Sequence, residues 1–385
     1  MPDSSPPARR KRSLIRRVIC SFTILIALIA LGGFFFVTFD TASAATFADQ
    51  TLRPAIGDGQ VIFLEGIYFQ LSDVLNRIKY SIVPPPNLYV VSGTVPVSSL
   101  EESAQSSTFS LAPISVPGIV PASGAGIWRA IPLGLFPGQV VLADTFVNPD
   151  RSRSYAFVTL IKMDMSRLRL WSVAGTQEPG GKVGKPGPGV IPQSVQKSGA
   201  LVAAFNGGFQ YRDGQYGMVV GNTTYVPLKK NLATLVAYAN GKVRIVNYKG
   251  QNLGANVVFV RQNCPMLIEN GAIVSDNQAN KALWGRTVNP GIYTWRSGVG
   301  VTARGNVVYA VGNSLTPSTL AAALSAAGAV NAMQLDINPY WVRFDVFGNY
   351  ASGTYQHFVP MSGIHDGAYR YLHGYQKDFF YVTKA

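Results

Sequence analysis

The stretch TPSTLAAALSAAGAVNAMQLD, residues 316–336, predicts a helix followed directly by a strand. Thr316 is a plausible N-cap, Pro317 suits the first helical position, and Gly328 ends the helix. The run NAMQL then predicts a strand that ends at Asp336. Strand ends of this kind are where folds of helices and sheets usually present their chemistry. The stretch therefore predicts a mixed fold and makes Asp336 a candidate site residue.

The residues on either side predict more strands than helices. Residues 155–164 and 167–173 are expected to be paired strands, since the second alternates polar and apolar side chains. Residues 235–248 and 266–275 each predict a hairpin with Asn-Gly in the turn. We therefore expect an α+β fold in which mixed, twisted β-sheets and packed helices form one main domain over residues 127–385.

The N-terminus predicts a membrane anchor. Residues 9–17 hold six basic groups, and the following residues, 18–37, carry no charge. As a helix, residues 18–37 would span about 30 Å, which is one bilayer core. The positive side stays in the cytoplasm, so residues 1–17 are a basic cytoplasmic tail and the main domain is extracytoplasmic. Secretion after cleavage of a signal peptide near Ala44 is the alternative.

Residues 38–126 are expected to connect the anchor to the main domain. Within them, residues 60–80 carry apolar side chains at helical spacing and predict an amphipathic helix. Its apolar face could lie on the membrane, self-associate or pack on the domain, and we expect packing on the domain. Residues 81–126 are rich in Pro, Ser, Gly and Ala and predict a linker.

Composition and motif content exclude several classes of protein. The chain has 385 residues and a net charge of +14, but it contains no nucleic-acid-binding motif, so we expect no nucleic-acid partner. Cys20 and Cys264 cannot form a zinc cage. The histidines, His357, His365 and His373, have no serine nucleophile elbow to accompany them. Because phosphate-binding loops and dinucleotide fingerprints are also missing from the sequence, we expect neither a metal nor a cofactor.

Three short motifs could carry chemistry, and each has a plainer interpretation. In AAFNGGF, residues 203–209, adjacent glycines allow positive φ and expose successive N–H groups to an anion, or they form an ordinary tight turn. Arg296 suits bidentate binding of phosphate, or it is a solvated surface arginine. Asp336 is a nucleophile or an acid–base catalyst, or it caps a turn. Asn338 and Trp341 could hold a sugar hydroxyl and a sugar face, or they are turn and core residues.

The order of these motifs resembles the phosphodiester glycosidase family over about residues 150–345. The ordered set is AAFNGGF, YGMVV, ATLVAYANGKV, VRQNCPMLIENG, WRSGVGV, TPSTLAAAL and MQLD. The resemblance implies a mixed α+β domain that hydrolyses a sugar-1-phosphodiester and releases the sugar and a phosphomonoester. It matches Asn206, Gly207, Gly208, Arg296 and Asp336 to residues of the family's motifs.

The sequence departs from the family pattern directly after Asp336. The family has Gly-Gly-Gly-Ser there, whereas this chain has Ile337, Asn338, Pro339 and Tyr340. A glycine run leaves room for a ligand and offers backbone donors, while proline lacks an N–H and has a restricted φ. The departure implies a different substrate or a loss of activity.

The resemblance also implies different roles for the residues of the site. Arg296 and the amides of Gly207 and Gly208 would hold phosphate, and Asp336 would act at the anomeric carbon or activate water. Glu269 is our candidate for a second carboxylate. We expect an extracytoplasmic, membrane-anchored glycosidase that acts on phosphate-linked glycans or cell-wall polymers. A non-catalytic glycan- or polymer-binding protein of the same fold is the alternative.

Overall fold

The computed structural model divides the chain into two compact units, Met1–Val61 and Ile62–Ala385. The predicted tail at 1–17, the predicted anchor at 18–37 and Ala44 lie outside the described residues, so they stay predictions. Within the described part of the chain, no helix is both long enough and apolar enough to cross a membrane. The described residues are 47–86, 89, 94–97, 106–180, 184–275, 284, 293–349, 354–356, 358–364 and 370–385.

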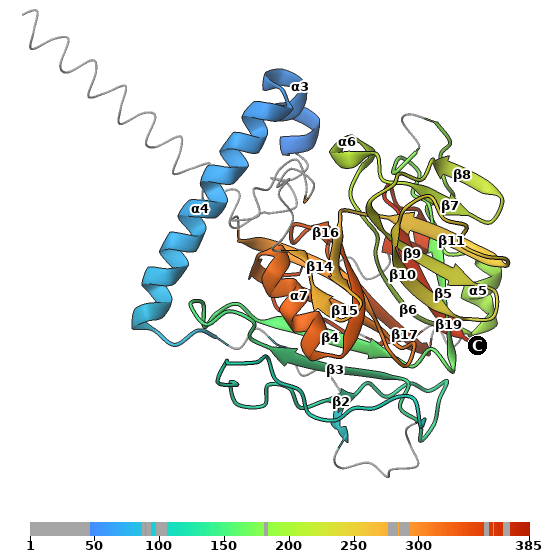
Figure 1. The fold of residues 1–385 in the computed structure, drawn as a ribbon, viewed down its shortest axis with the longest axis horizontal. Helices are drawn as coiled ribbons and strands as arrows, with labels where there is room; N and C mark the ends of the chain where they lie inside the picture. The colour runs from blue at the N-terminus through green and yellow to red at the C-terminus, as the bar shows by residue number, and fades with distance from the viewer. Residues whose placement is uncertain are drawn as a thin grey trace, which may run out of the picture. The chain divides into compact units, whose positions relative to one another are not determined.

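The larger unit is built mainly from three antiparallel sheets (Figure 1). The first sheet has nine strands in the order β1-β2-β3-β4-β15-β14-β16-β12-β13. Their bounds, in that order, are Val95–Pro96, Arg129–Ala130, Leu142–Val147, Val158–Met163, Val307–Leu315, Thr294–Thr302, Ala329–Ile337, Met266–Glu269 and Ala272–Ile273.

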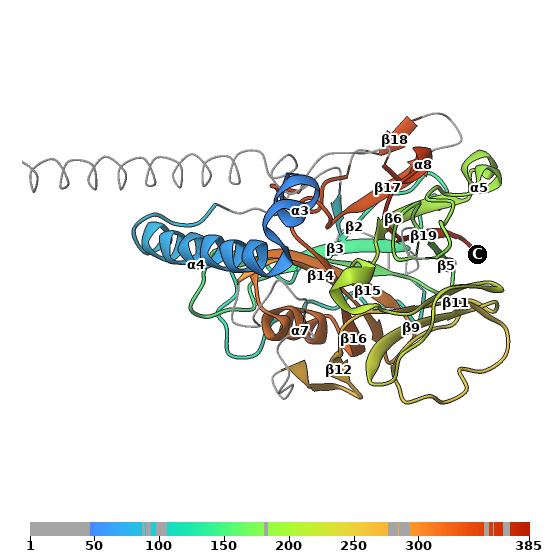
Figure 2. The ribbon, with the colours of Figure 1, turned by 90° about the horizontal axis from the view of Figure 1, so that it is seen from above.

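The other two sheets have five strands each. The order β10-β9-β11-β7-β8 joins Val243–Tyr248, Leu232–Tyr238, Val257–Gln262, Met218–Val220 and Thr223–Val226. The order β18-β17-β6-β19-β5 joins Thr354–Gln356, Phe344–Asn349, Leu201–Asn206, Phe379–Lys384 and Leu168–Val173 (Figure 2).

One apolar core receives side chains from all three sheets. Val299 of β14, Leu235 of β9 and Phe205 of β6 are each fully buried in it. Strand β9, for example, contributes the alternate residues Ala233, Leu235 and Ala237, as the period of two dictates. The outer face of the nine-stranded sheet has its own core, which includes Phe109 and Leu111. Residues of the predicted linker therefore pack against this sheet.

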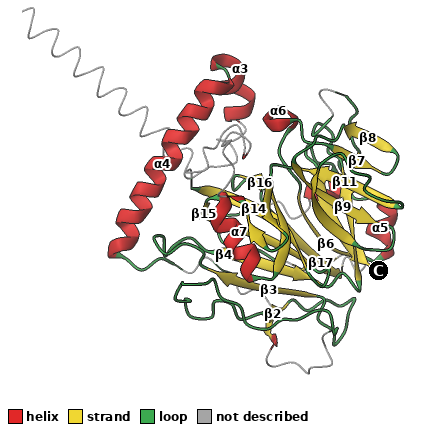
Figure 3. Cartoon of the chain, in the orientation of Figure 1, coloured by secondary structure: helices red, strands yellow, loops and turns green. Residues whose placement is uncertain are grey.

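The helix predicted in the opening stretch is confirmed as α7, Pro317–Ala326, which covers β14, β15 and β16 (Figure 3). Thr316 and Thr319 form a reciprocal capping box, and Gly328 follows the helix with a φ of 87°. Apart from α4, the other helices among the described residues of this unit are short. They are α5 (Gln193–Ser198), α6 (Tyr211–Gly214) and α8 (Arg370–His373). The mixed, sheet-rich fold class is confirmed.

Both predicted hairpins are confirmed. Strand β9 pairs with β10, and β12 pairs with β13 around Asn270 and Gly271, whose φ values are 51° and 84°. Positive φ at both positions is the backbone that an Asn-Gly hairpin turn requires.

The predicted pairing of residues 155–164 with 167–173 is wrong. Strand β4 pairs with β3 and β15, whereas β5 pairs with β19 at the end of the chain. A turn closed by Arg167 N–H on the Asp164 carbonyl (3.1 Å) carries the chain from the first sheet to the third. Residue alternation indicates a strand but does not specify its partner, and here the partner of β5 lies about two hundred residues further along the sequence.

The amphipathic helix predicted at 60–80 is confirmed as α4, Asp58–Ile82, but its expected packing is wrong. Leu71, Val74 and Ile78 on its apolar face are more than half exposed. The opposite face is anchored instead, because Asp73 accepts two hydrogen bonds of 2.7 Å from the guanidinium of Arg153. In the smaller unit, the described residues form a π-helix at Ala48–Leu52 and α3 at Arg53–Ile56.

Candidate functional site

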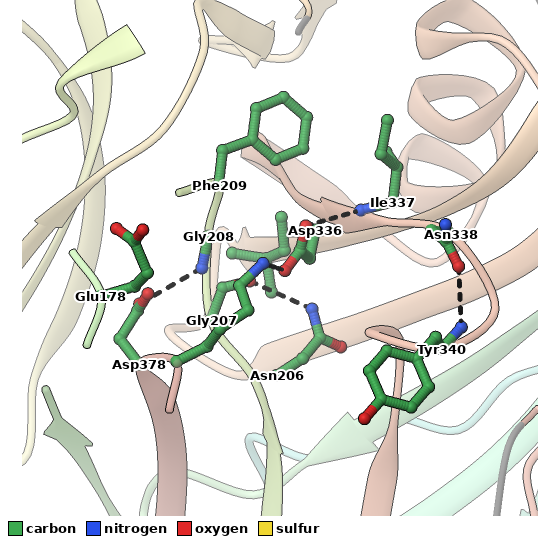
Figure 4. Close-up of polar contacts among 12 residues, drawn as sticks. Glu178, Asn206, Gly207, Gly208, Phe209, Asp336, Ile337, Asn338, Tyr340 and Asp378 are labelled. Atoms are coloured by element: carbon green, nitrogen blue, oxygen red, sulfur yellow. Dashed lines mark hydrogen bonds and ion pairs between the residues drawn. The ribbon is translucent and has the colours of Figure 1, made fainter. Parts of the chain in front are cut away.

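Asp336 lies at the C-terminal end of β16, where the first and third sheets meet (Figure 4). Its backbone N–H donates to the carbonyl of Gly207 (3.1 Å), and its carbonyl accepts from the Ser297 hydroxyl (2.8 Å). Strands β6 and β14 therefore hold the backbone from both sides. The carboxylate accepts from the N–H of Ile337 (3.1 Å), and the residue is only 4% exposed.

The carboxylate of Asp336 forms a buried ion pair with Lys377. The Lys377 ammonium donates to Oδ2, and the lysine is 3% exposed. Burial raises the pKa of Asp336 to about 7, although the ammonium of Lys377 lowers it, and the nearby Asp378 carboxylate raises it further. A carboxyl group that titrates near neutrality can accept or give a proton at physiological pH. Asp336 is thus suited to acid–base work.

Asn206 is fully engaged within the protein. Its side-chain amide donates to the Ser297 hydroxyl (2.9 Å), and its side-chain carbonyl accepts from the Tyr309 hydroxyl (2.8 Å) and the Arg343 N–H (3.0 Å). These bonds tie β6 to β14, β15 and the segment that enters β17. The structure therefore brings Asn206 close to Asp336 through Ser297, as a residue that holds the strands together.

Gly207 and Gly208 do face an anion, but the anion belongs to the protein. The Gly207 N–H donates to the Asp378 carbonyl (3.1 Å), and the Gly208 N–H donates to the Asp378 carboxylate (3.2 Å). The expected positive φ is not found at either glycine. A side chain at Gly207 would collide with Asp378, so close approach is what requires glycine there.

Asp378 is held in turn by a fully buried arginine. Arg261 donates to both carboxylate oxygens of Asp378 (2.8 and 2.9 Å), and neither side chain is exposed. Arg261 also donates to the carbonyl of Phe209 (3.0 Å). Two desolvated charges are tolerated when they pair with good geometry and their remaining donors are satisfied. This pair fixes the strand end that carries Lys377.

Arg296 is buried in a different environment from the one predicted. It is not exposed, and its guanidinium donates to the Leu315 carbonyl (2.7 Å) and to the Gln334 side chain (2.9 Å). Burial lowers the pKa of Arg296 to about 9. Lys377, rather than Arg296, is the cation in contact with Asp336.

Glu269 does not approach Asp336. Strand β12 pairs with β16 so that Ile268 lies opposite Ala332, which puts Glu269 beside Asn331. Asp336 is five residues further along β16, or about 17 Å away at the usual rise of a strand. Glu269 instead accepts from the side-chain amide of Asn247 (3.3 Å).

The loop after Asp336 brings one aromatic side chain onto the ion pair. The Lys377 ammonium lies 4.5 Å from the centre of the Trp341 ring. Asn338 shapes this loop, since its backbone has a φ of 83° and its side chain accepts from the Tyr340 N–H (3.0 Å). The structure therefore places Trp341 at the site and gives Asn338 a turn-forming contact.

Sequence reasoning missed the charged residues that surround Asp336. Lys377 and Asp378 directly precede the apolar strand β19, and Arg261 ends the apolar run of β11. Glu178 is a second carboxylate in range of Lys377 and Asp378; its pKa is raised by burial, and it accepts from the Tyr211 N–H (2.8 Å). The sequence feature that could have identified these residues is a charged side chain at the end of a buried strand.

Among the described residues, no cluster of His, Cys, Asp or Glu could hold a metal ion. Residues 199–336 match the model of the family described as phosphodiester glycosidase. The resemblance predicted from the motif order is thereby confirmed for this segment, which contains Asn206 and ends at Asp336. Residues 199–336, the family segment, are therefore similar in sequence to phosphodiester glycosidases. No curated protein matches the chain by sequence.

Two solved structures are distantly similar to this chain. One is the catalytic domain of zebrafish N-acetylglucosamine-1-phosphodiester alpha-N-acetylglucosaminidase, auto-inhibited by its pro-peptide. It is 13% identical, with coverage of 76% of this chain and 95% of that chain and a TM-score of 0.40. The other is a hypothetical protein from Synechocystis. It is 12% identical, with coverage of 64% of this chain and 62% of that chain and a TM-score of 0.35.

Proposed function

We propose that this chain is a glycosidase that hydrolyses the bond between an anomeric carbon and a phosphodiester. One observation carries the proposal. Asp336, the last residue of the family segment, is a buried carboxylate that pairs with Lys377, and the pKa of Asp336 is raised to about 7. A carboxylate and a cation in contact are the two groups that such a reaction needs.

The leaving group of this reaction needs little protonation by the protein. The bridging oxygen departs as part of a phosphate monoester, so the site must mainly neutralise phosphate and stabilise positive charge at the anomeric carbon. In the proposed reaction the Lys377 ammonium exchanges Asp336 for a phosphate oxygen. Asp336, freed in its ionised form, either takes a proton from the attacking water or attacks the anomeric carbon itself. In the second case water then hydrolyses the glycosyl ester of Asp336. The products are the free sugar and a phosphomonoester.

The proposed setting of this reaction is extracytoplasmic. The uncharged residues 18–37 and the basic residues 9–17 favour an anchor with the main domain on the outer side. A domain in that place would meet phosphate-linked glycans or cell-wall polymers as substrates. Proteolytic release near Ala44 would leave the same substrates within reach.

A second candidate function is glycan binding without catalysis. Asp336 and Lys377 are 4% and 3% exposed, and Trp341 lies against Lys377. Pro339 and Tyr340 occupy positions where the family pattern has a glycine and a serine. A site this closed favours recognition by the half-buried side chains of Tyr340 and Trp341 over turnover at the carboxylate.

The test is hydrolysis by the full-length protein of a panel of sugar-1-phosphodiesters, with free sugar and new phosphomonoester both measured. We expect the two products in equal amounts, and we expect Asp336→Asn to abolish both. Asp345→Asn is a matched control, since Asp345 is also a buried carboxylate in an ion pair, with Arg343 (2.6 Å). Glycan binding that persists in Asp336→Asn, with no product from the unmodified protein, would support the binding function instead.

A further inference from the structure

Helix α4 is attached to its own domain by its polar face. Besides the ion pair between Asp73 and Arg153, the Tyr155 hydroxyl donates to Asp73 (2.9 Å), and Tyr80 packs on Tyr155 with ring centres 5.0 Å apart. Amphipathic helices of globular proteins normally bury the apolar stripe and expose the polar one. In α4 this arrangement is inverted, so the apolar stripe is exposed and can bind a partner outside the domain.

The exposed stripe is long and uncharged. It extends from Phe63, 67% exposed, to Ile82, 78% exposed, which is about 30 Å of helix. Every member is at least 40% exposed, so none is covered by its own domain. The members are Phe63, Leu64, Ile67, Leu71, Val74, Leu75, Ile78 and Ile82.

The spacing of the stripe fits a partner helix. From Leu64 to Ile78 the apolar residues follow at intervals of three, four, three and four, which is the heptad spacing of helices that pack side by side. A contiguous exposed apolar surface of this kind marks an interaction site rather than ordinary surface.

The stripe is also self-complementary when read in reverse. If a second α4 runs antiparallel, with Leu71 opposite Val74, then Ile67 meets Ile78 and Phe63 meets Ile82. A two-fold symmetric dimer requires a patch that matches itself in this way. We infer that residues 63–82 form an antiparallel helix pair with a second copy of this chain, an interaction that is independent of the proposed hydrolysis.

The charges of α4 argue against a lipid surface as the occupant. Interfacial helices carry a polar face rich in Lys and Arg that binds anionic headgroups. The sequence of α4 has three acidic residues, Asp58, Glu65 and Asp73, against two basic ones, Arg77 and Lys79. A protein partner with an apolar stripe fits this surface better.

The test is crosslinking of the full-length protein in detergent with a short bismaleimide, in a Cys20→Ser background. Cys264 is buried, so an introduced cysteine is the reactive thiol. Leu71→Cys lies near the two-fold axis and should give a covalent dimer in high yield. Leu64→Cys should not give a covalent dimer, because residue 64 of one copy and residue 64 of the other are about 25 Å apart along an antiparallel pair. Ser72→Cys is the matched control at the same height on the helix, outside the apolar stripe.

Each other outcome overturns the inference. Dimers from both Leu71→Cys and Leu64→Cys would mean a parallel pair. Dimers from Ser72→Cys in equal yield would mean random collision. With no crosslinking, a probe on Leu71→Cys that becomes shielded from water only in lipid nanodiscs would assign the stripe to the membrane. A probe exposed in both media would show that nothing covers the stripe. Because Leu71 is exposed in the monomer, Leu71→Glu should abolish the dimer while the protein keeps a cooperative unfolding transition.

Discussion

The chemistry of Asp336 comes from opposing effects on one carboxyl group. Burial raises its pKa to about 7, and the ammonium of Lys377 acts against that rise. Each effect disappears without the neighbouring structure, since an exposed aspartate titrates near 4. The raised pKa of Asp336 therefore depends on the exclusion of water by the ends of β16 and β19.

The pH dependence of turnover should follow this carboxyl group. If Asp336 works in its ionised form, kcat/KM should rise with pH through a midpoint near 7. Lys377→Met removes the charge that favours ionisation, so its midpoint should move to higher pH and kcat/KM should fall by about 100-fold. A pH–rate profile of both proteins measures this, and an unchanged midpoint in Lys377→Met would contradict it.

A second buried carboxyl group should make stability depend on pH. Burial raises the pKa of Asp144 to about 7, even though the Tyr89 hydroxyl donates to it (2.8 Å). Between about pH 4 and pH 7 the folded state therefore keeps a proton on Asp144 that the unfolded state has lost. The stabilisation from this proton is fully present below about pH 4 and is lost as pH rises toward 7. Asp144→Asn should reduce the fall in unfolding temperature between pH 5 and pH 8. A fall as steep as in the unmodified protein would show that Asp144 does not contribute.

At the scale of elements, local signals were sufficient where neighbours in sequence interact. Thr316, Pro317 and Gly328 predicted α7, and Asn270-Gly271 predicted a hairpin turn, because caps and turns are made by adjacent residues. The partner of β5 and the outward apolar face of α4 were not predictable, because each depends on residues about eighty or more positions away.

The end of β6 should tolerate no side chain at its first glycine. Gly207→Ala places a methyl group against Asp378 and disrupts its pair with Arg261, so we expect a loss of about 3 kcal/mol in the free energy of unfolding. Gly59→Ala is the control, because no atom lies within 4 Å of the new methyl group and helix propensity should keep the change within about 1 kcal/mol. Denaturant unfolding gives both values; equal stability of the two variants would contradict the packing role.

At the scale of the whole molecule, the site is assembled from more than the family segment. Asn206 and Asp336 lie within residues 199–336 and were predicted from motif order, whereas Glu178 and Lys377 lie outside that segment. Lys377 reaches Asp336 only because β19 inserts between β6 and β5. Such long-range assembly leaves no local signal, which is why sequence reasoning found one carboxylate and missed its partner.

The chain should fail to fold without its last strand. Deleting residues 370–385 removes β19, which pairs with both β6 and β5, and it removes the buried Phe380 from the central core. We expect a complete loss of cooperative thermal unfolding. Deleting Ala385 alone, which gives up one terminal hydrogen bond to Arg167, should leave the transition in place. A cooperative transition in the longer deletion would show that the third sheet is dispensable.

In the proposed reaction, Asp336 and Lys377 act together on a sugar-1-phosphodiester. The most direct test follows both products in one reaction with the full-length protein, beside Asp336→Asn, Lys377→Met and the control Asp345→Asn, all checked for unchanged unfolding temperature. We predict equal release of sugar and phosphomonoester that is lost in Asp336→Asn, about 100-fold slower in Lys377→Met and retained in Asp345→Asn. Full turnover by folded Asp336→Asn would contradict it.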